Sequence, residues 1–186
     1  GLSSPRVLQR FQNPPGPALV EEPSGNHVAR LATKPDAAFP NHGTVTYDRT
    51  DPGAFDLVVA DFDFRLTASP GFVAADGFGF ALLNTGPFGT TGAVGGDAEE
   101  PGFAASLGVG FDAYRNPSEV SANHVSIHFD NVKLREFDVP PALNLASGEL
   151  THARVILRPG GGYSDVSVIL TPAGGEPITV VDRFVV

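Results

Sequence analysis

The stretch LGVGFDAYRNPSEVSANHVSIHF (107–129) holds two alternating runs separated by a polar turn. Every second residue is apolar from Val109 to Ala113, and again from Val125 to Phe129. Because successive side chains of a strand point to opposite faces, each run predicts a strand with one apolar and one polar face. If the two strands are neighbours, their polar side chains share one face of a sheet.

Similar short runs recur along most of the chain. Glycine and proline turns such as RPGGGY and TPAGGEP separate the later runs. About ten short strands at hairpin spacing, with little or no helix, predict an all-β fold, an antiparallel β-sandwich or jelly roll. We expect strands within residues 27–33, 43–49, 55–67, 71–86, 104–114, 123–129, 132–137, 152–158, 165–171 and 178–186.

Two of these runs predict how the sandwich packs. In FDLVVADFDFRLT (55–67), phenylalanines alternate with aspartates, which is typical of a half-buried strand. In the next run, Gly77 and Gly79 interrupt an otherwise apolar strand. Glycines inside a strand indicate the close approach of another backbone or a bend.

The 186 residues suffice for one domain with a sizeable core. Residues 1–26 include NPPGPALVEEPSGN, and this proline density predicts an extended arm or linker. We therefore expect the sandwich domain to occupy residues 27–186. The glycine-rich loop at 86–102 can form neither helix nor strand, and so long a loop is typically functional or mobile.

Composition restricts the partners. A net charge of -9, with 12 scattered Lys and Arg residues, disfavours binding to nucleic acid or anionic lipid. No apolar run approaches the roughly 18 residues of a membrane span. The chain has no Cys, Met or Trp, so disulfides and thiolate metal sites are excluded. An acidic surface is typical of calcium-dependent extracellular proteins, and we expect a secreted or cell-surface location.

The turn after the first run has the chemistry of a cation site. Asp112, the carbonyl of Tyr114, Asn116 and Glu119 place oxygen atoms around one turn. Calcium takes six to eight oxygen ligands, so this set is suitable for it. The alternative is an ordinary turn, because Asx residues after a strand also cap turns.

Four segments together resemble the L-type lectin family, the legume-lectin or concanavalin A-like sandwich. They are ADGFGFAL (75–82), GG (95–96), LGVGFDAYRN (107–116) and NHVSI (123–127), and their order and separation match that family. The resemblance covers roughly residues 27–186. Since the family usually continues into one or two further strands, it implies a domain that lacks terminal strands.

The resemblance also implies a carbohydrate site. In the family, the Asp of the ADG element follows a cis peptide and hydrogen-bonds sugar hydroxyls, which corresponds to Asp76. A glycine of the GG loop, Gly95 or Gly96, offers a backbone N–H. The aromatic residue of the next loop, here Tyr114, stacks on the sugar, and Asn116 completes the polar contacts.

This chain departs from the family at the metal site. The family places a Glu two residues before the Asp to bind a transition metal, and Gly110 stands there instead. We therefore expect no transition metal and at most one calcium, with Glu119 in place of the second bridging Asp. His124 aligns with the family's metal-ligating histidine, but with Gly110 opposite we interpret it first as a strand-end histidine bonded to backbone. We expect His128 to face solvent.

The function expected from these observations is a non-catalytic carbohydrate-binding domain whose partner is a glycan or polysaccharide. The alternative is a structural or adhesive module that self-assembles, or docks to a neighbouring domain, through a sheet edge or the N-terminal arm. A glycosidase needs paired carboxylates across the scissile bond. No E-x-D-x-x-E-like run exists, and DFD (61–63) does not provide such a pair, so we expect no enzyme activity.

Overall fold

The computed structural model describes residues 7–11, 17–32, 42–48, 54–68, 70–91 and 99–186. The chain divides into two compact units. The first comprises residues 1–52 and 84–97, and the second comprises residues 53–83 and 98–186.

The first unit contains two pairs of strands and a short helix. Strand β1 (Val7–Phe11) pairs antiparallel with β4 (His42–Thr46), and β2 (Ala18–Glu21) pairs antiparallel with β3 (His27–Arg30). Helix α1 (Thr85–Phe88) has four residues. Strands β1 and β2 thus fall within the predicted arm, and a domain boundary at residue 27 stays a prediction.

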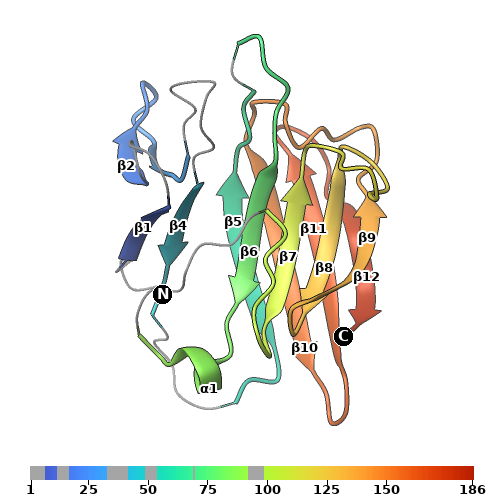
Figure 1. Cartoon of the computed structure of the whole chain (residues 1–186). Helices are drawn as coiled ribbons and strands as arrows, with labels where there is room; N and C mark the ends of the chain where they lie inside the picture. The colour runs from blue at the N-terminus through green and yellow to red at the C-terminus, as the bar shows by residue number, and fades with distance from the viewer. Residues whose placement is uncertain (1–6, 12–16, 33–41, 49–53, 69, 92–98) are drawn as a thin grey trace. The chain divides into compact units, whose positions relative to one another are not determined.

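The second unit contains two four-stranded antiparallel sheets, one in front of the other in Figure 1. The first sheet has the order β6-β7-β8-β9, and the second has the order β12-β11-β10-β5. All ten strands expected from the sequence are present, as β3 to β12. The strands of this unit are β5 (Val58–Phe64), β6 (Gly77–Leu82), β7 (Leu107–Asp112), β8 (His124–Phe129), β9 (Val132–Asp138), β10 (Thr151–Pro159), β11 (Ser164–Pro172) and β12 (Ile178–Val185).

Phenylalanines join the two sheets of the second unit. Phe62 and Phe64 of β5 pack against Phe78 of β6 and Phe111 of β7, with ring centroids 5.0 Å apart for Phe64 and Phe111. Phe111 is fully buried. The opposite face of β5 carries aspartates that pair across to β10, so the predicted alternation of this strand is confirmed.

Strand β7 is buried on both faces. Its glycines explain how a second layer of chain reaches it. A Cβ at Gly108 would overlap the carbonyl oxygen of Pro101, and a Cβ at Gly77 of neighbouring β6 would overlap the carbonyl oxygen of Phe111. The close backbone approach predicted at Gly77 is therefore confirmed.

The covering segment also corrects one expectation. His128, predicted to face solvent, is 5% exposed, and its Nε2 lies 2.8 Å from the Ser126 hydroxyl and 3.8 Å from Glu100 Oε1. Glu100 belongs to the segment over β7 and β8, which is why the polar face of β8 is not open to water.

Within the described ranges, no helix is long and apolar enough to cross a membrane.

Candidate functional site

Neighbouring strands bring polar residues together at one end of the β6-β7-β8-β9 sheet. The antiparallel register pairs Gly77 with Asp112, and Asp112 with His124. Beyond the strand end, the N–H of Ala113 donates to the carbonyl of Asp76 at 2.9 Å. Asp76, just before β6, therefore lies opposite the residue that follows Asp112. The peptide bond between Ala75 and Asp76 is cis, which the family resemblance implies.

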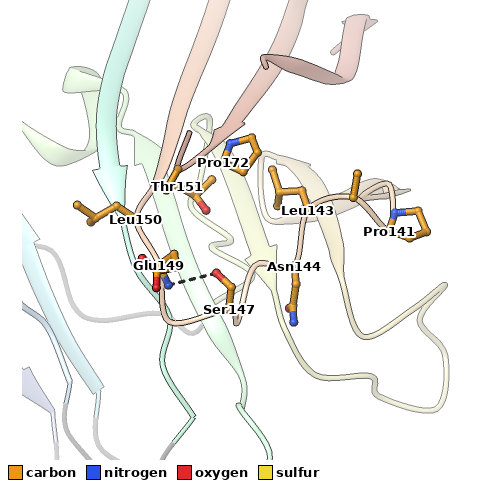
Figure 2. Close-up of a pocket in the computed structure, with 10 residues that line it drawn as sticks. Pro141, Leu143, Asn144, Ser147, Glu149, Leu150, Thr151 and Pro172 are labelled. Carbon is orange, nitrogen blue, oxygen red and sulfur yellow. Dashed lines mark hydrogen bonds between the residues drawn. The ribbon is translucent and has the colours of Figure 1, made fainter. Parts of the chain in front are cut away.

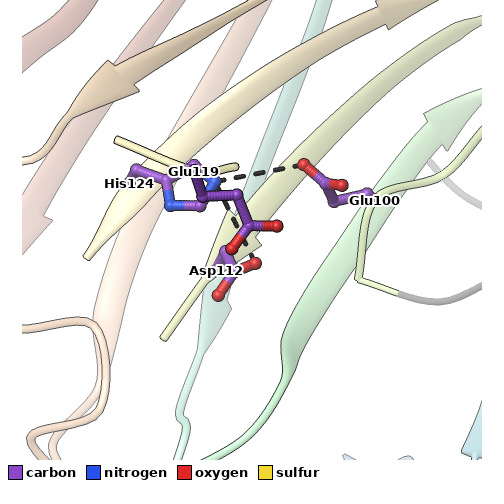
Figure 3. A group of neighbouring side chains, drawn as sticks. All are labelled: Glu100, Asp112, Glu119 and His124. Carbon is purple, nitrogen blue, oxygen red and sulfur yellow. Dashed lines mark ion pairs between the residues drawn. The ribbon is translucent and has the colours of Figure 1, made fainter. Parts of the chain in front are cut away.

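Four side chains gather at this end, as Figure 3 shows: Glu100, Asp112, Glu119 and His124. One ligand atom from each lies within 4.8 Å of the others. Asp112 and His124 are fully buried, Glu119 is 5% exposed, and Glu100 is half-buried. The cluster combines one imidazole with three carboxylates, all of them groups that bind metal ions.

The tautomer of His124 follows from its backbone partner. Its Nδ1 lies 2.8 Å from the carbonyl oxygen of Ser121. A carbonyl only accepts, so Nδ1 carries the hydrogen and Nε2 presents a lone pair to the cluster. This Nε2 lies 4.0 Å from Glu100 Oε1 and 4.0 Å from Asp112 Oδ2. His124 is thus both bonded to backbone, as predicted, and turned toward the acidic group.

Within the part of the chain that the structure describes, the buried side-chain atoms without a hydrogen-bond partner are Asp112 Oδ2 and His124 Nε2. Leaving such atoms unpaired costs about 1–3 kcal/mol each. Their separation of 4.0 Å is too long for a hydrogen bond. Two such atoms that face one another can share one ion between them. These residues therefore fit a bound metal ion.

The electrostatics of the cluster favour a cation. Burial raises the pKa of Asp112 to about 6, against the opposing effects of the Tyr114 N–H and His124, and Glu119 and Glu99 raise it further. Burial also raises the pKa of Glu99, to which Asp76, Glu100 and Glu119 contribute. These carboxylates are close enough to repel one another, so a positive ion among them would be stabilised.

One ammonium group offsets part of this charge. Lys133 Nζ lies 3.1 Å from Glu100 Oε1 and 4.0 Å from Glu119 Oε1, and it also donates to Glu136. Burial opposes the charge on Lys133, but the hydrogen bonds to Glu136 and Glu100 raise its pKa. Its single charge stands beside three carboxylates of the cluster.

The loop after β7 holds its own carboxylates in place. The N–H of Tyr114 donates to Asp112 Oδ1 at 2.6 Å, and Asn116 donates to Glu119 through both its backbone N–H and its side-chain amide. Tyr114 and Asn116, predicted as oxygen ligands, thus supply hydrogen-bond donors to the acidic residues. Asp112, Glu119 and His124 are the predicted metal residues that lie in the cluster.

Sequence reasoning missed Glu100, which falls in the glycine-rich loop at 86–102 and was assigned to no site. A signal was present in the strand it approaches. Gly108 and Gly110 are two residues apart and therefore share a face of β7, the face that also carries Asp112. Two glycines on one face leave room for another chain segment.

Three of the predicted saccharide residues, Asp76, Tyr114 and Asn116, lie at the edge of this cluster. Asp76 is exposed, Tyr114 is 40% exposed and Asn116 is half-buried. The exposed ring of Tyr114 and the carboxylate of Asp76 are accessible to a ligand. Gly95 and Gly96 lie outside the described residues. The roles of these five residues in sugar binding stay predictions.

A pocket of about 260 Å³ lies between the β9–β10 connection and the end of β11 (Figure 2). Asn123, next to His124, holds one wall of it by donating to the carbonyl of Leu143 at 2.8 Å and accepting from the N–H of Leu145 at 2.9 Å. Among the residues that line this pocket, only Glu149 is ionisable, so we assign the pocket no chemistry. The lining residues are Pro141, Ala142, Leu143, Asn144, Ser147, Glu149, Leu150, Thr151, Pro172 and Ala173.

Two facing antiparallel sheets with a polar cluster at one end form a β-sandwich. The sequence matches no protein-family model and no curated protein. The structure is similar to a Lotus tetragonolobus seed lectin isoform, with a TM-score of 0.58 and 18% identity over 98% of this chain and 80% of the lectin.

It is also similar to peanut lectin, in a structure with a nine-residue peptide, with a TM-score of 0.50 and 22% identity over 69% of this chain. That match spans 56% of the peanut lectin chain. The chain thus has a legume-lectin-like, concanavalin A-like fold, as its sequence predicts.

Proposed function

We propose that this chain is a non-catalytic carbohydrate-binding domain whose site is formed by Asp76, Tyr114 and Asn116, with Gly95 or Gly96. The observation that supports it most is the hydrogen bond between Ala113 and Asp76, which sets the exposed Asp76 beside the Tyr114 loop. A sugar presents hydroxyls and an apolar C–H face. A carboxylate and an amide suit the hydroxyls, and an aromatic ring suits the C–H face.

We further propose that a divalent cation bound at the four-residue cluster supports this site; the sequence alone favours calcium. The two unpartnered buried atoms, on Asp112 and His124, support the proposal. When bound, the ion would supply positive charge that holds the acidic side chains in place. Because Asp112 and Glu119 anchor the Tyr114 loop, fixing them would preorganise the saccharide site and lower the entropy lost on binding.

The two aspartates on the exposed face of β5 also favour binding without catalysis. Asp61 pairs with Arg154 at 2.7 Å, and Asp63 pairs with His152 at 2.9 Å. Neither aspartate is therefore placed as a free acid or nucleophile of a glycosidase. A chromogenic glycoside screen is expected to give no turnover. Glycan binding implies an extracellular or cell-surface location.

A glycan array tests the proposal. The wild-type protein is expected to retain a defined set of glycans, and Asp76→Ala and Asn116→Ala are expected to lose them. Asp56→Ala, which removes an exposed carboxylate elsewhere in the second unit, is the matched control and should bind as the wild type does. Equal binding by all variants, or no binding by the wild type, contradicts the proposed site.

A second candidate is a structural or adhesive module that assembles through a sheet edge or the N-terminal arm. The edge strand β9 favours it, since Val132 is 54% and Leu134 is 41% exposed, and among the described strands β9 pairs with β8 alone. Such an edge can accept a strand from another chain. Light scattering that shows a monomer at every concentration would contradict self-assembly.

A further inference from the structure

A segment of chain crosses the polar face of β7, and the crossing depends on two glycines. A Cβ at Gly108 would overlap the Pro101 carbonyl. A Cβ at Gly110 would lie 2.8 Å from the Glu99 carbonyl oxygen, closer still to Ser126 Oγ, and 3.5 Å from the Cα of Glu100. Residues 99–101 therefore lie directly on the strand, in space that any side chain at these two positions would fill.

This crossing carries a carboxylate into the cluster. Gly110 has no side chain, but the Cα of Glu100 lies next to it, and Glu100 Oε1 reaches to 4.0 Å from His124 Nε2. His124 Nε2 is one of the two unpartnered buried atoms. Figure 3 shows Glu100 entering from a different segment than Asp112 and His124. The absence of a side chain at Gly110 thus leaves the space through which Glu100 reaches the cluster.

We propose that Glu100 is a metal ligand supplied across the glycines of β7, and that the ion is a transition metal of the Zn²⁺ type rather than calcium. The proposal deepens, and rests on, the cation part of the proposed function. Calcium takes six to eight oxygen ligands. The cluster instead offers one imidazole nitrogen beside three carboxylates, and an imidazole ligand suits Zn²⁺ and other transition metals better than calcium. The expectation that no transition metal binds rested mainly on Gly110.

The charges of the cluster agree with this assignment. Glu100, Asp112 and Glu119 carry three negative charges when ionised, and His124 is neutral when Nε2 is a ligand. A divalent ion leaves one negative charge. Lys133, at 3.1 Å from Glu100 Oε1, offsets part of this remaining charge, although it also pairs with Glu136.

Isothermal titration with Zn²⁺ alone, and separately with Ca²⁺ alone, tests the assignment in the full chain. The wild type is expected to bind one Zn²⁺ more tightly than Ca²⁺. Glu100→Gln should weaken Zn²⁺ binding at least about tenfold, since even residues behind metal ligands typically contribute 10–100-fold. Asp56→Asn removes an exposed charge that is not part of the cluster and is the matched control, with Zn²⁺ affinity expected within about threefold of wild type.

Other results of these titrations would each contradict one part of the proposal. Unchanged Zn²⁺ affinity in Glu100→Gln, or an equal loss in Asp56→Asn, removes Glu100 as a ligand. Tighter binding of Ca²⁺ than Zn²⁺ removes the transition-metal assignment, and no binding of either ion removes the cation altogether. Thermal melts without metal show whether the variants fold. Glu100→Asp keeps the charge and is a second variant, whose Zn²⁺ affinity is expected to lie between those of the wild type and Glu100→Gln. Glycan binding is measured separately, so its failure with intact Zn²⁺ binding contradicts the saccharide site alone.

Discussion

Replacing Gly110 by alanine tests whether residues 99–101 are built onto β7. The new Cβ would lie 2.8 Å from the Glu99 carbonyl oxygen, about 0.6 Å short of the 3.4 Å at which ordinary contact begins, and closer still to the Ser126 hydroxyl. The serine side chain can rotate away, but the carbonyl belongs to the backbone. The segment that carries Glu100 must therefore move outward.

The cost of this movement can be stated as a stability change. Overpacking a well-packed region costs about 1–3 kcal/mol. For a chain of this length, each kcal/mol lowers the melting temperature by about 2–4 °C, so we expect a decrease of about 2–12 °C. Moving Glu100 away from His124 should also weaken Zn²⁺ binding.

The assay compares thermal and urea unfolding of Gly110→Ala with that of Gly162→Ala, followed by circular dichroism. Gly162 has open space around its position, so its alanine variant should stay within about 0.5 kcal/mol of wild type. Equal melting temperatures for the two variants, with Zn²⁺ affinity unchanged in Gly110→Ala, would refute the reasoning. A backbone segment at the described distance cannot accept a methyl group without moving.

Three further predictions concern the core, an ion pair and the ligand surface. Phe111→Ala empties the contact between the sheets and should cost about 3–5 kcal/mol in urea unfolding; a loss below about 1 kcal/mol would contradict the described packing. Hydrogen bonds from Arg183, and from Arg158, hold the pKa of Asp165 below its ordinary value. The stability from this carboxylate is therefore present above about pH 4 and is lost as the pH falls through the lower folded pKa. The stability difference between wild type and Asp165→Asn should shrink in that range, and a constant difference down to about pH 2 would contradict the pairing. Tyr114→Ala should weaken glycan binding by about 0.5–1.5 kcal/mol and leave the melting temperature nearly unchanged; unaltered affinity would remove the ring from the site.

Local patterns predicted the strands well because each strand repeats one physical rule. In β5, alternation of phenylalanine and aspartate set which side chains enter the core, and the structure has Phe64 buried and Asp63 exposed. The turn after Asp112 was also readable, since its carboxylates and donors lie within a few residues of one another. Strands β5, β6 and β7 end a few residues inside the predicted runs, whereas β10 and β11 extend one residue beyond theirs at each end.

Contacts between distant segments were not readable in the same way. Glu100 lies twelve positions before Asp112, and no local pattern fixes where it crosses β7. For the same reason His128 was expected to face water, although the crossing segment buries it. The alternation of Gly108 and Gly110 indicated that something approaches this face, but not which residue.

The most direct test of the account measures the affinity for a glycan, once the array has identified one, with the cation present and with it removed. Chelation is expected to weaken glycan binding at least about tenfold, equivalent to about 1.4 kcal/mol, and added Zn²⁺ should restore it. An affinity that stays the same after the bound metal is shown to be gone would contradict the claim that the buried cluster supports the saccharide site.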